Sequence, residues 1–329
     1  MILKNNDPVI EVGIIGAGAI TTTLHLPLLS VMDNIKLKYI ADIFKPNEIA
    51  KLYNMDSYEI VDVENLPNCD LLLLTTPVGV REEYIKEFSS REIPIFSEKP
   101  FALDLKSHEN YLKNNSRMSC NYMKIWYNSS KLFEYIISSN IFGILKKISI
   151  IEGGIIGKTN RGTDTYQSNT RLSGGGVIME SSCHTLSVLA DVFDDIIVKE
   201  SSIVWQNDLD VEAKITFEAT KKQTIPTEYL ITLIKPVETK TLLFFENCII
   251  SFNHTIPNPN FIITDYKKTT KLQIRNDLKF AMSSQQAYYL KWKGFLEKIS
   301  AGEDIDARVE TSIKTTELIS NIYNMDKKK

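Results

Sequence analysis

The stretch GIIGAGAITTTLHLP, residues 13–27, decides the fold of the N-terminal half of this chain. It continues an apolar strand, VIEVGII, and leads into a helical stretch that we expect from about residue 19 to 32. Gly16 permits a sharp turn after the strand, and Gly18 lets the backbone approach a pyrophosphate. The third position is usually small and is Thr21 here, which weakens the match. The stretch predicts a dinucleotide-binding turn, and the alternative is a glycine turn that binds nothing.

The residues around this turn indicate which dinucleotide would bind. The amides at the start of the helix, at Ala19 and Ile20, are expected to hold the phosphates. Asp42 ends the next strand, 21 residues after Thr21, where an acid that binds the ribose is expected. A carboxylate there accepts hydrogen bonds from ribose hydroxyls and repels a 2′-phosphate, which favours NAD over NADP. Lys45 could offset that repulsion, so NADP stays possible, and Asp42 could instead cap a strand or helix.

The pattern of the whole chain predicts two domains. Up to about residue 120, apolar strands near 36–42, 69–77, 93–100 and 117–124 alternate with helical stretches. Such alternation is typical of α/β proteins and predicts a doubly wound parallel sheet. Longer segments of alternating polarity follow, which favour a C-terminal α+β domain with a large, open, mostly antiparallel sheet, closed by a long amphipathic helix. We place the domains at 1–121 and 122–329.

Composition narrows the class of protein. The chain has 329 residues, 43% hydrophobic and 24% charged, and a net charge of -3. This balance is typical of a globular protein and shows no broad basic surface for nucleic acid or for a membrane. No secretory signal or membrane-span length of apolar residues is seen. The four cysteines are scattered, which favours reduced thiols in the cytoplasm; they are Cys69, Cys120, Cys183 and Cys248.

Two sequence stretches end further strands of the predicted parallel sheet. The third strand ends in a TTP loop and the fourth in an EKP loop, at the carboxyl edge where open α/β sheets bind ligands. Lys99 there could reach a substrate oxygen above a nicotinamide, or it could be an ordinary surface lysine. We expect the cofactor to lie against these loops, at Thr75, Thr76, Pro77, Glu98 and Lys99.

A third stretch, LSGGGVIMESSCHTLSVLADVF at 172–193, carries a second candidate group. Glu180 and His184 are four residues apart, so both would project from one face of a helix. A carboxylate beside an imidazole is a plausible acid–base unit, and the alternative is a helix-surface pair without catalytic consequence. No metal-ligand spacing is visible, and His25, His108 and His254 each stand alone.

Taken together, these motifs resemble the Gfo/Idh/MocA family of oxidoreductases, from about residue 9 to 323. The shared marks, in the family's order, are GIIGAGAI…HLP, TTP, EKP, SGGGVIMESSCH and the closing helix pattern. The resemblance implies an N-terminal Rossmann domain and a C-terminal domain whose open sheet commonly forms the oligomer interface, in a homodimer or homotetramer. It also implies an NAD(P)-dependent enzyme that acts on a sugar, a cyclitol or a nucleotide sugar.

The resemblance also assigns residues. The family's EKP lysine, which contacts the reacting oxygen, is Lys99, and the bond from Lys99 to Pro100 would be cis. The family's aspartate and histidine correspond to Glu180 and His184. Further departures from the family pattern are Ser182, Ser187 and Arg81.

Two functions therefore stand. In the first, the chain is a dehydrogenase or reductase, with His184 as general base, Lys99 stabilising the alkoxide and Glu180 orienting His184 or a substrate hydroxyl. In the second, it is a regulatory protein of the same fold that binds a dinucleotide without turnover. A polar segment with Arg161 and Arg171 could cover the substrate, or be a solvated loop.

Overall fold

The computed structural model describes residues 8–154, 165–266, 271–274, 282–303 and 309–326. The chain forms two compact units. The first comprises residues 1–102, 106–121 and 288–309, and the second residues 103–105, 122–287 and 310–329. The main division thus falls between residues 121 and 122, and one segment near the C-terminus returns to the first unit.

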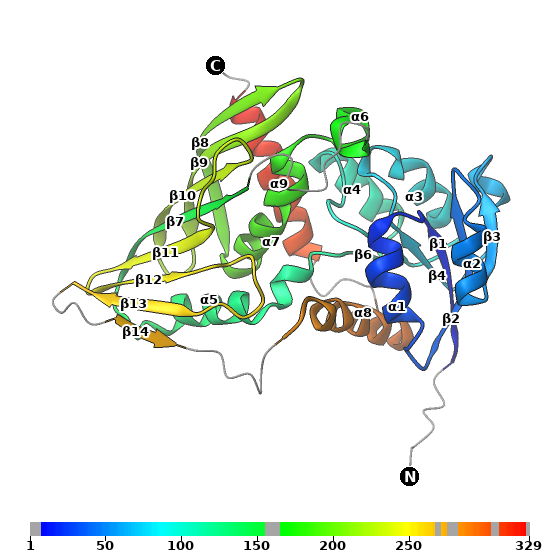
Figure 1. Cartoon of the computed structure of the whole chain (residues 1–329), viewed down its shortest axis with the longest axis horizontal. Helices are drawn as coiled ribbons and strands as arrows, with labels where there is room; N and C mark the ends of the chain where they lie inside the picture. The colour runs from blue at the N-terminus through cyan, green and yellow to red at the C-terminus, as the bar shows by residue number, and fades with distance from the viewer. Residues whose placement is uncertain (1–7, 155–164, 267–270, 275–281, 304–308, 327–329) are drawn as a thin grey trace, which may run out of the picture. The chain divides into compact units, whose positions relative to one another are not determined.

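The first unit contains a six-stranded parallel sheet in the order β3-β2-β1-β4-β5-β6 (Figure 1). The strand order reverses beside β1, as in a doubly wound sheet, so the predicted Rossmann-type fold is confirmed. All residues of β4 are buried, because helices cover both faces of the sheet. The strands are β1 Ile10–Ile15, β2 Ile35–Asp42, β3 Asp56–Glu59, β4 Leu71–Leu74, β5 Ile95–Ser97 and β6 Met118–Cys120.

Helices pack on this sheet through an apolar core. Trp292, Phe295 and Leu296 of α8 join a cluster that includes Val12 and Ile14 of β1. The helices are α1 Leu26–Leu29, α2 Asn47–Tyr53, α3 Arg81–Ser90, α4 Leu105–Asn114 and, from Tyr288 onward, α8 Ser284–Ala301. The sequence did not predict α8 as a separate helix or β3 as a strand.

The second unit contains an eight-stranded sheet in the order β14-β13-β12-β11-β7-β10-β9-β8. All neighbours are antiparallel except β7 and β10, which confirms the predicted mostly antiparallel sheet. The strands are β7 Leu145–Gly153, β8 Asp195–Gln206, β9 Leu209–Thr220, β10 Thr224–Thr232, β11 Lys240–Phe245, β12 Cys248–Phe252, β13 Phe261–Asp265 and β14 Lys271–Ile274.

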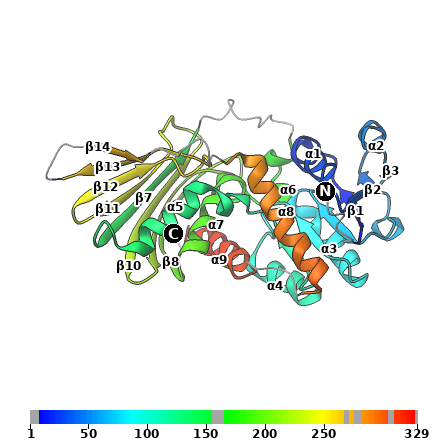
Figure 2. The same cartoon turned by 90° about the horizontal axis from the view of Figure 1, so that it is seen from below.

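Three helices lie on one face of this sheet: α5 Asn128–Ser139, α7 Cys183–Val192 and α9 Val309–Asp326 (Figure 2). A short helix, α6 Thr170–Ser173, precedes the glycine-rich turn. The single closing helix expected from the sequence is two helices in the structure, α8 and α9, whose bounds leave residues 302–308 between them. No helix of the described ranges has both the length and the apolarity that a membrane crossing needs.

Candidate active site

The turn after β1 has the conformation that the sequence predicts. Gly16 has φ +103°, and a side chain there would lie 2.5 Å from Oγ1 of Thr75, so glycine is needed for both its backbone and its lack of a Cβ. A Cβ added at Gly18 would meet no atom within 4 Å. The backbone at Gly18 therefore faces open space, as a bound pyrophosphate would require.

Thr21, the departure from the glycine motif, is accommodated by hydrogen bonds. Its side chain is fully buried, and its hydroxyl donates to the carbonyl oxygen of Gly16 over 2.8 Å. The Oγ1 atoms of Thr21 and Thr75 lie 2.7 Å apart, within hydrogen-bonding distance. The chain from Thr21 to His25 forms a π-helical turn before α1. The larger residue thus ties the glycine turn to the end of β4 and leaves Gly18 uncovered.

Asp42 ends β2 and braces the same turn. Its two carboxylate oxygens accept hydrogen bonds from the backbone N–H groups of Ala17, over 2.5 Å, and Ile43, over 2.6 Å. The capping role that the sequence left open is therefore present. A carboxylate has about four acceptor positions, so each oxygen keeps room for a ribose hydroxyl. Lys45 is exposed to solvent.

Arg81 joins the TTP loop to the EKP loop. Its side chain is buried, with 2% of the residue exposed, at the start of α3. The guanidinium donates to the carbonyl oxygens of Thr76, over 2.9 Å, of Glu98, over 2.5 Å, and of Pro100. The last two residues flank Lys99. Arg81, a departure from the family pattern, therefore fixes the backbone around the candidate catalytic lysine.

Glu98 holds the other side of this loop through a buried network. Its Oε1 lies 2.9 Å from Nε2 of His25 and accepts from Nδ2 of Asn121 over 2.6 Å. The indole N–H of Trp292 donates to Nδ1 of His25 over 3.0 Å. An indole can only donate, so Nδ1 carries no proton, and the ring proton is on Nε2 and faces Glu98. His25 does not stand alone, contrary to the expectation from the sequence.

The charge of Glu98 follows from these bonds. Burial by itself raises the pKa of its carboxyl, but the hydrogen bonds from His25 and Asn121 outweigh burial and hold the pKa below its usual value. The Oε2 atom accepts the backbone N–H of Lys99 over 3.1 Å. The bond between Lys99 and Pro100 is cis, as the resemblance implied. The backbone of Lys99 is thus fixed by Glu98 and Arg81, and its side chain is half-buried.

In the second unit, the triple-glycine turn packs against Asp210 of β9. A Cβ at Gly176 would overlap the backbone oxygen of Asp210, so the close approach requires glycine. The Asp210 carboxylate accepts the N–H groups of Gly176, over 2.5 Å, and Ile178, over 2.7 Å, and the hydroxyl of Tyr323, over 2.9 Å. Burial raises the pKa of Asp210 in spite of these bonds. The glycines therefore set where the following helix begins.

Glu180 and His184 lie in that following helix, but its first part is not α-helical. Residues Ile178–Ser182 form a π-helical turn, and α7 starts at Cys183. The sequence argument for a shared face assumed α-helical spacing throughout, and a π turn holds more residues. Glu180 is largely buried, with 8% exposed, and His184 is half-buried.

The two serine departures in this helix have structural partners. The hydroxyl of Ser182 lies 3.2 Å from that of Tyr229 on β10. The hydroxyl of Ser187 donates to the carbonyl oxygen of His184 over 2.7 Å. Both side chains are fully buried, so they serve helix packing in this chain.

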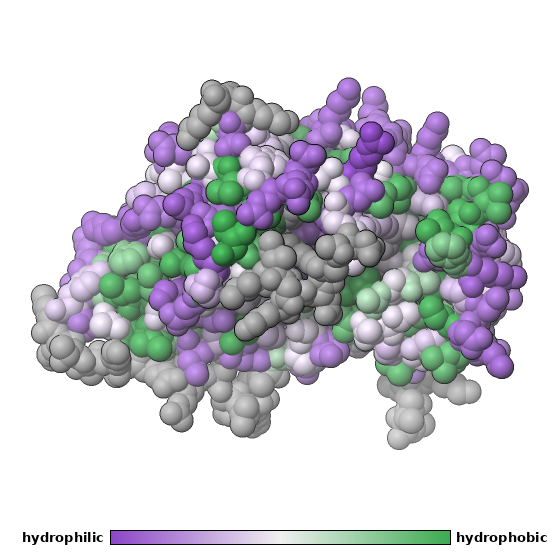
Figure 3. Space-filling model, turned by 45° about the horizontal axis from the view of Figure 1, so that its top comes forward, coloured by the Kyte–Doolittle hydropathy of each residue, from purple (hydrophilic) through white to green (hydrophobic). Residues whose placement is uncertain are grey.

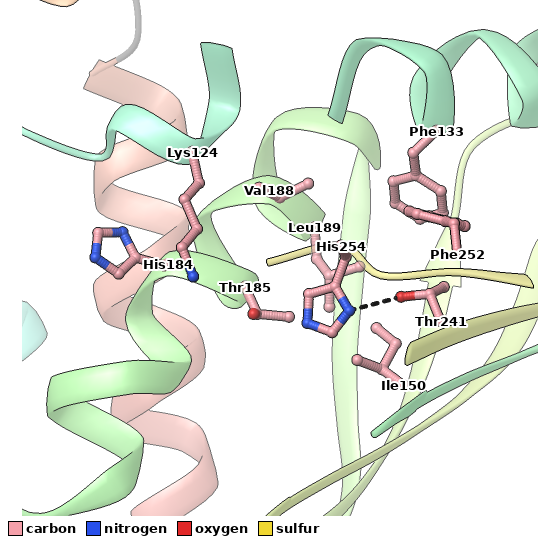
Figure 4. Close-up of a pocket in the computed structure, with 10 residues that line it drawn as sticks. All are labelled: Lys124, Phe133, Ile150, His184, Thr185, Val188, Leu189, Thr241, Phe252 and His254. Atoms are coloured by element: carbon pink, nitrogen blue, oxygen red, sulfur yellow. Dashed lines mark hydrogen bonds between the residues drawn. The ribbon is translucent and has the colours of Figure 1, made fainter. Parts of the chain in front are cut away.

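A pocket lies beside His184, entirely within the second unit (Figure 4). Its polar lining residues come from a turn before α5, from α7, from β11 and from the segment after β12. They are Lys124, His184, Thr185, Thr241 and His254, and the apolar ones are Phe133, Ile150, Val188, Leu189 and Phe252. Sequence reasoning missed Lys124 and treated His254 as isolated.

A buried carboxylate, Glu152 of β7, lies behind this pocket. Its Oε2 accepts the hydroxyls of Thr185, over 2.7 Å, and Tyr229, over 2.8 Å, and lies 3.5 Å from Nε2 of His254. Nδ1 of His254 lies 3.0 Å from the Thr241 hydroxyl. Burial raises the pKa of Glu152, but His254 and the charge of Lys124 outweigh it and lower the pKa to about 2. No sequence spacing signals this group, because its members come from separate elements that are far apart along the chain.

The remaining candidates from the sequence are placed as follows. Lys99 belongs to the first unit, and Glu180 and His184 belong to the second. Arg161 lies outside the described residues, and Arg171 lies in α6, capped by the side chain of Asn169. Within the described ranges, no three His, Cys, Asp or Glu side chains are grouped to hold a metal ion.

Comparisons with known proteins agree with this architecture. Residues 10–124 match the model of an oxidoreductase family with an NAD-binding Rossmann fold. No curated protein matches the chain in sequence. Among solved structures, the 3-ketoreductase KijD10 from Actinomadura kijaniata, in complex with NADP and TDP-benzene, has a TM-score of 0.82 at 12% identity and covers 97% of this chain and 98% of its own.

Levoglucosan dehydrogenase, in complex with NADH and levoglucosan, has a TM-score of 0.80 at 11% identity, covering 97% of each chain. At such identities the two solved structures show that the fold is shared along nearly the whole chain.

Proposed function

Since the chain belongs, through residues 10–124, to the Gfo/Idh/MocA oxidoreductase family, whose Rossmann fold binds NAD, we propose that it is an NAD(P)-dependent dehydrogenase or reductase. It would transfer a hydride between the nicotinamide and a secondary alcohol or ketone of a sugar, a cyclitol or a nucleotide sugar. The similar folds of a 3-ketoreductase and of levoglucosan dehydrogenase support this class of substrate.

The observation that carries the proposal is the way in which Lys99 is held. It follows β5 at the carboxyl edge of the parallel sheet, the edge at which Gly16 follows β1 and Thr75 follows β4. Its N–H is bound by Glu98, and the carbonyls on either side are bound by Arg81. A catalytic group needs such a fixed backbone, because small displacements at the reacting atom cost large factors in rate.

We assign the cofactor to the glycine turn and Asp42. The turn would hold the pyrophosphate through Gly16, Gly18, Ala19 and Ile20, and the TTP loop would line the nicotinamide with Thr75, Thr76 and Pro77. Ile43 and Phe44 follow Asp42 and are 63% and 80% exposed, which offers apolar surface for an adenine ring. Figure 3 shows apolar side chains gathered over this end of the first unit. NAD is favoured because Asp42 would repel a 2′-phosphate.

We assign the chemistry to Lys99 and His184. In the oxidative direction His184 accepts the hydroxyl proton as general base, and Lys99 stabilises the alkoxide by charge and hydrogen bond. Glu180 orients His184 or a neighbouring substrate hydroxyl. The cofactor supplies the hydride acceptor, and these side chains supply orientation and proton transfer.

The test is nicotinamide absorbance during turnover with NAD and NADP over a panel of sugars, cyclitols and nucleotide sugars. His184→Ala should lower turnover by about 10²- to 10⁴-fold, and Lys99→Ala should also abolish most of it. Lys106→Ala is the matched control, because Lys106 is exposed on α4. Equal turnover in Lys99→Ala and Lys106→Ala would remove Lys99 from the mechanism. Tight binding of NAD without turnover on any substrate would instead support the regulatory protein.

We further propose that the chain forms a homodimer or homotetramer through the open face of the eight-stranded sheet. Among the described helices of the second unit, none lies on the face opposite α5, α7 and α9 (Figure 1). Half-buried apolar side chains cross the central strands there, namely Ile151, Leu230, Leu242, Phe244 and Ile249. Phe244→Glu should shift the sedimentation coefficient toward that of the monomer, and an unchanged coefficient would contradict this interface.

The four cysteines bear on the compartment. All of them are buried as thiols that form no disulfide with one another. Cysteines without disulfides are typical of reducing compartments, which supports the cytoplasm as the site of action.

A further inference from the structure

A buried chain of hydrogen bonds in the first unit ends at the backbone of Lys99. We propose that His25 and Trp292 are positioning residues for Lys99. Trp292 keeps His25 in its neutral form, and His25 fixes the Glu98 carboxylate together with its charge. Both residues act through Glu98, which binds the N–H of Lys99. The inference rests on the proposed function, which makes Lys99 a catalytic residue.

The ring of His25 is enclosed by three aromatic rings. His25 is fully buried, and the rings of Phe96, Tyr288 and Trp292 lie 6.1, 5.4 and 5.9 Å from its own, measured between centroids. All three pairs are T-shaped, an arrangement that aromatic rings favour. This packing holds the His25 ring in the orientation in which Nδ1 faces Trp292 and Nε2 faces Glu98.

The indole of Trp292 determines which nitrogen of His25 carries a proton. Its N–H lies 3.0 Å from Nδ1, and an indole can only donate, so Nδ1 must accept and carries no proton. The indole itself is fixed, because it is fully buried and stacked on Phe96 with ring centroids 4.0 Å apart. A second proton on the imidazole would place two N–H groups against each other. Trp292 therefore favours the neutral ring, with its proton on Nε2 and directed at Glu98.

The neutral form of His25 leaves the charge of Glu98 uncancelled. Burial raises the pKa of the Glu98 carboxyl, but its hydrogen bonds and the charge of Lys99 outweigh burial and keep it ionised. The N–H groups of His25, Asn121 and Lys99 that donate to this carboxylate are all neutral. An imidazolium at His25 would cancel the negative charge, whereas a neutral imidazole leaves it to attract the Lys99 ammonium.

The two oxygens of Glu98 join the ends of this chain. Oε1 takes the hydrogen bonds from His25, over 2.9 Å, and from Asn121, over 2.6 Å. Oε2 accepts the N–H of Lys99 over 3.1 Å. One carboxylate thus links α8, which carries Trp292, to the loop after β5. Because a small shift at the reacting group costs a large factor in rate, loss of either link should lower turnover without weakening cofactor binding at the glycine turn.

The test compares variants of the full chain, with NAD as oxidant and myo-inositol, D-glucose and levoglucosan as substrates. His25→Leu removes both the donor and the acceptor, whereas His25→Gln keeps one of each. His25→Leu should lower kcat and kcat/KM equally, by about 10- to 100-fold, and His25→Gln should restore part of both. Trp292→Phe keeps an aromatic ring and loses the N–H, so kcat should fall by about 2- to 10-fold.

The matched control is Phe295→Leu. Phe295 is buried on the same helix as Trp292 and contacts Phe96, with ring centroids 5.3 Å apart, but its side chain has no polar atom. This variant disturbs the same aromatic cluster and leaves the hydrogen bonds in place. It should keep the kcat of the wild type, and all variants should bind NADH as the wild type does.

Two further readouts need no turnover. Nitrogen NMR of the His25 ring in the wild type should show a proton on Nε2 and none on Nδ1. Amide hydrogen exchange at Lys99 should accelerate by about 10- to 100-fold in His25→Leu and by about 2- to 10-fold in Trp292→Phe. The exchange at Lys99 should not change in Phe295→Leu.

The outcomes separate this inference from the proposed function. A proton on Nδ1 of His25 in the wild type overturns the inference, as does unchanged exchange at Lys99 in both His25→Leu and Trp292→Phe. Equal losses of kcat in Trp292→Phe and Phe295→Leu also overturn it, because packing alone would then explain both. Trp292→Phe and the NMR of the wild type decide the matter if His25→Leu does not fold. Exchange in the expected order, in a wild type that oxidises none of these substrates, would keep the inference and refute the proposed dehydrogenase.

Discussion

Replacement of Arg81 by methionine should destabilise the first unit strongly. The substitution keeps an unbranched, apolar side chain and removes a guanidinium that donates to the carbonyls of Thr76, Glu98 and Pro100. The Glu98 carbonyl keeps a second donor, the Ser97 hydroxyl at 3.0 Å, whereas the carbonyls of Thr76 and Pro100 lose their side-chain donor. Each buried acceptor left without a donor costs about 1–3 kcal/mol, so these two should lower the free energy of unfolding by at least about 2 kcal/mol. That is a large part of the roughly 5–15 kcal/mol typical of a domain.

The assay is urea unfolding followed by tryptophan fluorescence. Trp292 belongs to the first unit and is stacked on Phe96 with ring centroids 4.0 Å apart, whereas Trp126 and Trp205 belong to the second. Measurement in the background Trp126→Phe and Trp205→Phe therefore reports the first unit alone, which is needed because the two units need not unfold together.

The matched control is Arg117→Met. Arg117 is half-buried in the same unit, and its Nη1 donates one long hydrogen bond, 3.5 Å, to the carbonyl of Glu92. We expect this control substitution to lower the free energy of unfolding by less than about 1 kcal/mol. If Arg81→Met lowers the free energy of unfolding no more than Arg117→Met does, the hydrogen bonds of Arg81 to the two loops do not contribute the stability assigned to them.

Three further changes test other parts of the structure. Gly176→Ala should destabilise the second unit by several kcal/mol in thermal unfolding, because its Cβ overlaps the backbone of Asp210; a change of melting temperature below about 1 °C would contradict that packing. Burial lowers the pKa of His108 from 6.5 to about 3, so the unfolded chain binds a proton that the folded chain does not, and stability should fall by about 1.4 kcal/mol per pH unit as pH drops from 6.5 toward 3. His108→Phe should make this pH dependence shallower, and an unchanged slope in urea unfolding would refute the assignment. Glu152→Gln should cost about 1–3 kcal/mol in urea unfolding, because the hydroxyls of Thr185 and Tyr229 would then donate to a neutral amide oxygen in place of a charged carboxylate oxygen; equal stability would show that the charge of Glu152 does not strengthen these bonds.

The pattern of residues along the chain was enough to predict the type of sheet in each half of this protein. The strand, glycine turn and helix around Gly16 depend on neighbours in sequence, so their pattern predicted the parallel sheet, which is confirmed. The alternation of polar and apolar residues predicted the antiparallel sheet for the same reason. Element ends were less predictable: a π-helical turn precedes both α1 and α7, and no residue pattern signalled either.

Only the tertiary structure decided how the candidate side chains are held. The hydrogen bond between His25 and Trp292 joins residues 267 positions apart, and the one between Asp210 and Tyr323 joins residues 113 apart. Such partners share no spacing that a pattern could reveal, because packing of the sheet and helices brings them together. The same holds for Arg81, which the sequence marked only as a departure from the family pattern. Burial turns its guanidinium toward backbone carbonyls, since a donor that solvent does not reach needs acceptors within the protein.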